Sequence, residues 1–234
     1  LLKIALALLL AVGITACGGS DTSSEDNKLI VSATLDPHSK ILEEAKTILA
    51  DEYDIDLQIE VLDDYYIFNK ALDAGEVDAN YFQHTPYLLE EVETKGYDIV
   101  SACEVHYEPL NLYSKNQLVD FEGQTISIVN GVSNVERALS LLIDKEIIGD
   151  YDMSNFNASK PNDSVTNSKV TLDCLDPGLL ANKVNDDGIA IIPGNYALTA
   201  WGADKALQYK ILGESKQVAG QKANIIAARK DNVN

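Results

Sequence analysis

The sequence has few of the residues that build a disulfide framework or a nucleic-acid interface. Its 234 residues include only three cysteines and one tryptophan, and 18 lysines and arginines stand against 37 aspartates and glutamates. Three cysteines cannot form a network of disulfides. A net charge of −19 repels phosphate backbones and anionic lipids, so it argues against nucleic-acid binding and against polybasic contact with a membrane.

Motifs of the common enzyme classes are also missing. The chain has no Gly-x-Ser-x-Gly, no Walker loop, no His-Glu-x-x-His and no Gly-x-Gly-x-x-Gly. The pairs Asp63-Asp64 and Asp186-Asp187 are adjacent loop acids of the kind that water usually covers. The sequence therefore offers no catalytic residues to nominate, and we predict a protein that is not an enzyme and has no cofactor, with an enzyme of unassigned chemistry as the weakest alternative.

The histidines and internal cysteines give little sign of a metal site. His38, His84 and His106 lack the close spacing and the His-rich loop of zinc carriers, so zinc binding with a carboxylate is the weaker alternative and we predict no metal. Otherwise His38 would cap a helix end and His106 would form a hydrogen bond at a strand end. Cys103 and Cys174 are predicted to be small buried apolar residues.

The first residues predict export and a lipid anchor. Residues 1–16 combine Lys3, an apolar run shorter than the roughly 20 residues of a spanning helix, and small residues before a cleavage point, as secretory signals do. Residues 14–18 resemble a bacterial lipobox, which implies that Cys17 carries lipid; the alternative is an incidental thiol. Two acyl chains suffice for stable anchoring. With residues 17–28 as a flexible tether, the folded part would work on the extracytoplasmic side of the cell membrane.

Strand and helix signals alternate in the rest of the chain. Strands are predicted at residues 29–34, 56–62, 99–105, 110–113, 125–129, 188–192 and 223–228. Helices are predicted to begin at Asp36-Pro37, Thr85-Pro86, Ser133 and Asp176-Pro177; Ser133 and Glu136 have the spacing of a capping box. This alternation predicts an α/β fold of mainly parallel sheets flanked by helices, and the length fits two such units.

Six groups of residues carry a family resemblance. They are residues 31–34 with 37–38, 69–72, 78–88, 105–110 with 112–114, 134–139 and 194–197. In this order, along residues 29–230, they resemble the NlpA-type methionine-binding lipoproteins of ABC importers, and the Asn-Tyr-Phe-Gln-His segment is the most specific part. The resemblance implies a two-lobed, type II periplasmic-binding-protein-like fold with a ligand cleft and two crossover strands.

The same resemblance implies the division of the chain. We place the first crossover near residues 108–110 and the return near residues 194–200. Lobe one would then comprise residues 29–108 plus 200–234, and lobe two would comprise residues 109–199.

An amino-acid ligand requires a cation for its carboxylate, acceptors for its ammonium group and an apolar slot. Arg137 offers a planar fork to a carboxylate and stands in the first turn of a predicted helix, where an anionic ligand would offset its conflict with the helix dipole. On spacing alone it could equally pair with Glu136 or Asp144 at the surface. The resemblance implies that Arg137 and Asn134 hold the ligand carboxylate.

The apolar slot is predicted from aromatic residues. Sulfur–aromatic contacts are worth about 0.3–1.5 kcal/mol, which suits a thioether. The resemblance implies contacts from Tyr65, Phe82 and His84, although aromatic residues after strands more often belong to the core. Tyr66 would replace Tyr65 if the match shifted by one residue.

One position departs from the family. Many members have asparagine where this chain has Pro193, and that side chain helps to hold the ligand amine. Proline offers neither an N–H nor a side-chain acceptor, so we expect Asn195 or a backbone carbonyl to substitute.

These observations predict a lipid-anchored substrate-binding protein of an ABC importer, with a permease and an ATPase as partner chains. The ligand would be methionine or a related small amino acid. The alternatives are a short-peptide binder, or a surface lipoprotein that binds partners and has a vestigial cleft.

Overall fold

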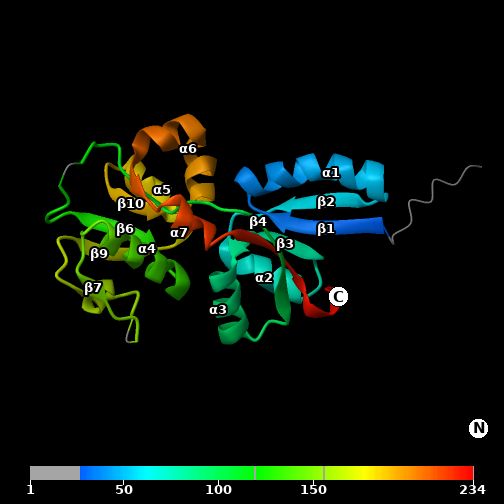
Figure 1. Cartoon of the computed structure of the whole chain (residues 1–234), viewed down its shortest axis with the longest axis horizontal. Helices are drawn as coiled ribbons and strands as arrows, with labels where there is room; N and C mark the ends of the chain where they lie inside the picture. The colour runs from blue at the N-terminus through cyan, green and yellow to red at the C-terminus, as the bar shows by residue number, and fades with distance from the viewer. Residues whose placement is uncertain (1–26, 119, 155, 234) are drawn as a thin grey trace, which may run out of the picture.

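The computed structural model describes residues 27–118, 120–154 and 156–233. The predicted signal, Cys17 and most of the predicted tether lie outside them. Within the described ranges the chain forms two α/β lobes side by side along the long axis of the molecule (Figure 1). No helix in these ranges is long and apolar enough to cross a membrane.

The first lobe is a five-stranded sheet covered by helices on both faces. Its strand order is β2-β1-β3-β12-β4. The strands are β1 (Lys28–Ala33), β2 (Asp56–Val61), β3 (Ala79–His84), β4 (Ile99–His106) and β12 (Asn224–Arg229). The helical elements are η2 (Leu35–Ser39), α1 (Lys40–Tyr53), α2 (Tyr65–Asp73), α3 (Thr85–Lys95) and η4 (Lys230–Asn232). Apolar residues of α1 pack on one face of the sheet, and those of α2 and α3 pack on the other.

The second lobe repeats this plan with strand order β11-β5-β10-β6-β9. Its strands are β5 (Asn111–Tyr113), β6 (Thr125–Val129), β9 (Thr171–Leu175), β10 (Ile189–Ile192) and β11 (Lys210–Gly213). Its helices are α4 (Val132–Asp144), α5 (Pro177–Asn185) and α6 (Gly194–Tyr209), which breaks at Gly202. The short elements β7 (Asp150–Tyr151), η3 (Pro161–Ser164) and β8 (Val165–Thr166) lie between β6 and β9 in the sequence.

Strand β10 shows why this sheet is covered on both faces. Successive side chains of a strand point to opposite faces, so a fully apolar strand needs two apolar layers. Ile189 and Ile191 enter the core under α4, whereas Ala190 and Ile192 enter the core under α5 and α6. All four residues are buried.

Each sheet is mainly parallel, as the sequence predicted, but includes one antiparallel strand. In each sheet one strand runs against the other four: β12 in the first lobe and β5 in the second. Both arrive from the other lobe, so they enter their sheet where the other strands end. The carboxyl ends of four strands of each sheet therefore face the other lobe.

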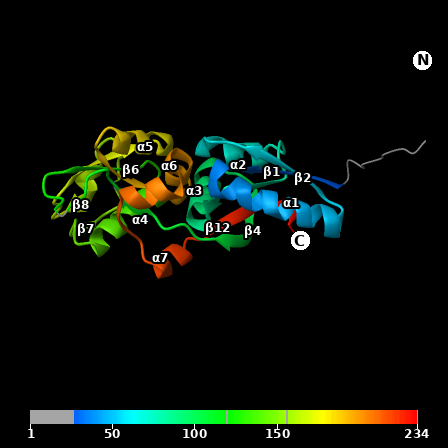
Figure 2. The ribbon, with the colours of Figure 1, turned by 90° about the horizontal axis from the view of Figure 1, so that it is seen from above.

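The chain passes between the lobes twice. It leaves the first sheet after β4 and enters the second at β5, and it returns through α7 (Lys216–Gly220) to β12, as Figure 2 shows from above. The predicted return at residues 194–200 is wrong, because β11 pairs with β5 and Ile211 and Leu212 pack against the second core. Residues 200–213 thus belong with the second sheet.

Three local predictions also need correction. Asp36 is extended and caps no helix, and α1 begins at Lys40. Helix α4 begins at Val132 after Gly131, so Ser133 does not form the predicted capping box. Cys103 is exposed because β4 is an edge strand, whereas Cys174 is half-buried against the second core; both thiols are free.

Candidate ligand-binding site

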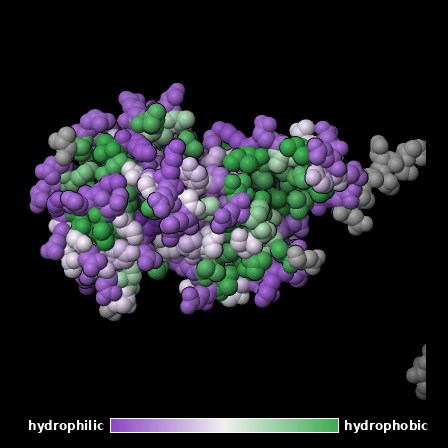
Figure 3. Space-filling model, viewed as in Figure 1, coloured by the Kyte–Doolittle hydropathy of each residue, from purple (hydrophilic) through white to green (hydrophobic). Residues whose placement is uncertain are grey.

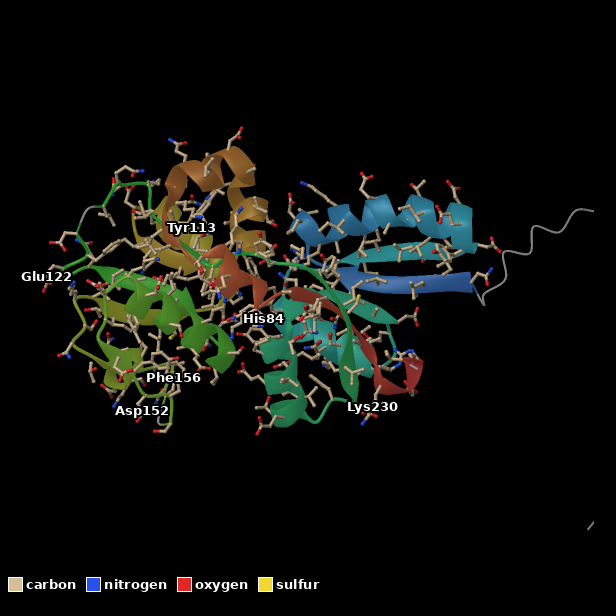
Figure 4. The ribbon with its side chains drawn as sticks, viewed as in Figure 1. His84, Tyr113, Glu122, Asp152, Phe156 and Lys230 are labelled. Carbon is tan, nitrogen blue, oxygen red and sulfur yellow. The ribbon has the colours of Figure 1, made fainter. Side chains whose placement is uncertain are left out.

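A pocket lies between the lobes and gathers most of the predicted site. It is lined by the predicted residues Tyr65, Phe82, His84, Asn134 and Arg137, and also by Gln83, Tyr87, Glu108, Pro193, Gly194 and Asn224. Most of these residues follow the carboxyl ends of β3, β4, β6 and β10, where open α/β sheets bind ligands. His84 lies at the junction of the lobes in Figure 4, whereas Tyr113 lies within the second lobe. Hydrophilic residues dominate the junction on the face shown in Figure 3.

The apolar wall of the pocket is a cluster of stacked rings. Phe82 stacks on Phe68 with ring centroids 4.1 Å apart, and Tyr65 meets Phe82 edge-on at 5.1 Å. Tyr65 is buried and Tyr66 is 47% exposed, so Tyr65 is the ring that faces the pocket. The rings therefore belong both to the core and to the pocket. The sequence had offered these as alternative roles, and in the structure the same rings have both.

Tyr65 also contacts the second lobe through Asn195, the sixth predicted residue. The Tyr65 hydroxyl donates to Asn195 Oδ1 over 2.8 Å, and both residues are buried. Burial raises the pKa of Tyr65 well above its ordinary value, so the phenol keeps the proton that it donates. Asn195 is not among the residues that line this pocket, so it does not take the place of the asparagine that Pro193 replaces.

His84 is a neutral imidazole at the end of β3. Burial, followed by the nearby Arg137 cation, lowers its pKa to about 3. Its Nδ1 accepts the backbone N–H of Tyr87 over 3.1 Å, which caps α3. The neutral ring must then carry its proton on Nε2, and this proton serves the hydrogen bond with the Asn134 side chain.

We expect His84→Asn to reduce the loss of stability in acid. The unfolded chain binds a proton at His84 near pH 6.5 but the folded chain only near pH 3, so this residue lowers the free energy of unfolding as pH falls through that window. The slope is about 1.4 kcal/mol per pH unit at most. Asparagine keeps an acceptor for the helix cap. Denaturant titrations at pH 7, 5.5 and 4.5 should show the variant losing less stability than the wild type; parallel curves would contradict the assignment.

Arg137 is not the free fork that the sequence predicted. Its Nε and Nη2 donate to the carboxylate of Glu214 over 2.7 and 2.6 Å, and Nη2 also donates to the Glu108 carbonyl over 2.7 Å. The side chains of Arg137 and Glu214 are 7% and 2% exposed. Among the described residues none accepts from Nη1, and Arg137 lines the pocket.

This ion pair also joins the two crossover segments. Glu214 Oε2 accepts the backbone N–H of Leu110 over 2.8 Å, and the Glu214 N–H donates to the Leu110 carbonyl over 3.0 Å. Arg137 in α4 therefore contacts both connections between the lobes. A group that binds Arg137 would therefore lie next to both crossover segments.

Glu108 is the main site residue that sequence reasoning missed. It lies on the first crossover, lines the pocket, and has a side chain only 11% exposed. Gly194 lies against the Glu108 side chain, since a methyl group added there would be 3.6 Å from Glu108 Oε2, an ordinary van der Waals contact. The signal in the sequence was the segment His106–Leu110, which we used only to place the crossover.

A buried amide network supports the pocket from behind. Asn69 and Gln83 exchange two hydrogen bonds of 2.9 and 2.7 Å, and Asn80 bonds to both over 2.9 Å. All three residues are buried, so each amide is held by the others. This network joins α2 to β3 and fixes the strand that ends in Phe82, Gln83 and His84.

The lobes also touch outside the pocket. The Glu90 carboxylate in α3 accepts the backbone N–H groups of Val132 and Ser133 over 3.0 and 2.8 Å, at the start of α4. On the opposite rim the Tyr196 hydroxyl donates to the Asp63 carbonyl over 3.0 Å. These contacts join the two lobes outside the pocket.

Comparison with known proteins agrees with this architecture. The family model described as NlpA lipoprotein matches residues 29–234. The chain belongs to the NlpA lipoprotein family. The methionine-binding lipoprotein MetQ of Bacillus subtilis is 44% identical over 141 residues, which cover 58% of this chain and 51% of that protein. The matched part thus spans about half the length of this relative.

Solved structures extend the NlpA comparison to nearly the whole chain. A periplasmic substrate-binding protein of an ABC transporter from Coxiella burnetii superposes with a TM-score of 0.76 at 29% identity, covering 87% of this chain and 85% of that one. A nutrient-binding protein from Burkholderia cenocepacia bound to methionine gives 0.77 at 30% identity, covering 87% and 86%. The predicted family and two-lobed α/β fold are confirmed, and the family is one of substrate-binding lipoproteins rather than enzymes.

Proposed function

We propose that this protein binds methionine, or a related small amino acid, in the pocket between its lobes and delivers it to an ABC importer. The observation that carries the proposal is the pocket itself, which puts a guanidinium end, a carboxylate and an aromatic wall around one space. A methionine-binding relative and a methionine-bound structural neighbour support the ligand class. A permease and an ATPase would be separate partner chains.

The three parts of an amino acid match three parts of the pocket. The ligand carboxylate would accept from Arg137 Nη1 and from the Asn134 amide. The ammonium group would donate to the Glu108 carboxylate, which takes the place of the asparagine that Pro193 replaces. The thioether would lie against Tyr65 and Phe82, where sulfur–aromatic contact adds to apolar burial.

Transport would use closure of the lobes about the crossover segments. An open form admits the ligand, and contacts from both lobes then favour the closed form, which docks on the permease. Arg137 and Asn134 belong to the second lobe and the aromatic wall to the first, so a bound ligand links them. A lipid on Cys17 would keep the protein near the permease.

Ligand retained through purification provides the direct test. Denaturing the purified protein should release a small amino acid, which mass spectrometry identifies. In a thermal-shift screen of amino acids and dipeptides, the ligand should raise Tm, because its binding adds RT ln(1 + [L]/Kd) to the free energy of unfolding. A response to dipeptides alone would make the protein a peptide binder. No response to any of them would leave a vestigial cleft and overturn the proposal.

We expect Glu108→Gln to weaken methionine binding about tenfold, because the ammonium group loses a charged acceptor. The analogue of methionine that lacks the amino group makes no such contact, so its affinity should not fall. Calorimetry with both compounds measures the two changes. An equal loss for both would show that Glu108 shapes the pocket without binding the ammonium group.

A further inference from the structure

We propose that His38, His106 and Glu108 form a binding site for a divalent transition-metal ion such as Zn²⁺. One ligand atom from each of the three lies within 4.8 Å of the others. His106 and Glu108 stand two residues apart, where β4 ends and the first crossover begins, and His38 comes from the turn before α1. The distance of His38 along the sequence concealed the cluster, and His84 is not part of it.

Both imidazoles are oriented as metal ligands are. Nδ1 of His38 bonds to the Thr34 hydroxyl over 2.6 Å, and Nδ1 of His106 bonds to the Tyr81 hydroxyl. When one ring nitrogen is fixed by such a partner, the other is held in position to bind an ion. The two rings lie 5.0 Å apart between centroids, and Nε2 of His106 faces the Glu108 carboxylate.

The His38 Nε2 atom supplies an independent argument. His38 is fully buried, and its Nε2 has no hydrogen-bond partner among the described residues. It therefore does not cap a helix end, as the sequence suggested. A buried polar atom without a partner raises the free energy of the folded state by about 1–3 kcal/mol. A bound ion would satisfy this nitrogen.

The chemistry of the donors fits zinc. His106 Nε2 and Glu108 Oε1 are 3.3 Å apart, which matches two ligands on a tetrahedral ion with bonds of about 2.0–2.1 Å. Two imidazoles and one carboxylate are a known zinc donor set and leave the fourth position open. The side chains of His106 and Glu108 are 21% and 11% exposed, which gives an ion a path of entry.

The cluster adjoins the ligand pocket through one residue. Glu108 Oε1 faces His106, whereas Oε2 lies near Gly194 in the pocket. The Glu108 carboxylate thus belongs both to the metal cluster and to the ligand pocket. An ion bound at Oε1 would make Oε2 a weaker hydrogen-bond acceptor. The metal site does not depend on the proposed amino-acid function, since His38 and His106 are not among the residues that line the pocket.

Cobalt absorption tests the site. The full chain carrying Cys103→Ser, so that this exposed thiol cannot bind, is stripped with a chelator and titrated with Co²⁺. We expect visible tetrahedral bands that saturate at one equivalent and disappear when Zn²⁺ is added.

His38→Gln and His106→Gln should abolish the bands, and Tyr81→Phe should weaken binding about 10–100-fold. Glu104→Gln makes the same charge change as Glu108→Gln at an exposed position on β4 and should leave the titration unchanged.

The outcomes separate the two proposals. Absence of the bands, or bands that survive both histidine substitutions, would overturn the metal site, with circular dichroism confirming that each variant is folded. Methionine binding by the metal-free protein would be unaffected by that result. Bands that shift or weaken when methionine is added would support the sharing of Glu108.

Discussion

Replacing Arg137 with methionine should lower the free energy of unfolding by about 3–5 kcal/mol, the scale for leaving one member of a buried ion pair alone. Glu214 has a side chain that is 2% exposed, and it would be left buried beside the crossover segments without its cation. Denaturant titration measures the loss. Because the same residue faces the pocket, the single substitution should also reduce binding, so it cannot by itself separate a structural role from a role in ligand binding.

The double variant Arg137→Met with Glu214→Gln separates these roles. Glutamine is neutral and still accepts from the Leu110 N–H, so most of the lost stability should return. Methionine binding should stay at least tenfold weaker than in the wild type, because no cation remains for the ligand carboxylate. A double variant that binds normally would show that Arg137 only holds the crossovers together.

Local patterns along the chain predicted much of the fold. The alternation of apolar and polar residues at 56–62 correctly predicted β2. The start at Thr85-Pro86 and the stop at Gly96 correctly predicted α3, and Gly96 has a φ of 76° at the C-cap of this helix. These signals succeed because backbone sterics and burial of one face act over a few residues. The capping box at Ser133 failed because Glu90, more than forty residues away, supplies the cap instead.

Long-range pairing was the part that the sequence could not predict. Strand β11 reads as a short apolar segment, and only its pairing with β5 assigns it to the second sheet. Arg137 and Glu214 are 77 residues apart, and spacing alone suggested Glu136 or Asp144 as partners. Five predicted pocket residues came together. Glu108 on the first crossover and Asn224 at the start of β12 did not stand out, because only the long-range pairing of the strands places them at the pocket.

Glu90→Gln should open the lobes and weaken methionine binding about thirtyfold, or about 2 kcal/mol. The first N–H groups of a helix have no partner within the helix and carry the positive end of its dipole. In this protein a carboxylate from the other lobe accepts two of them at the start of α4, so the bond exists only when the lobes are closed. Glutamine removes the charge and one acceptor.

Small-angle scattering and calorimetry together test this latch. The ligand-free variant should have a larger radius of gyration, and its apparent Kd should rise in proportion to the loss of closed molecules. Glu93→Gln provides the matched control, since Glu93 is exposed on the same helix. If both variants scatter and bind alike, Glu90 is only a surface contact. If Glu90→Gln alone expands the molecule, the cap of α4 contributes directly to closure of the lobes.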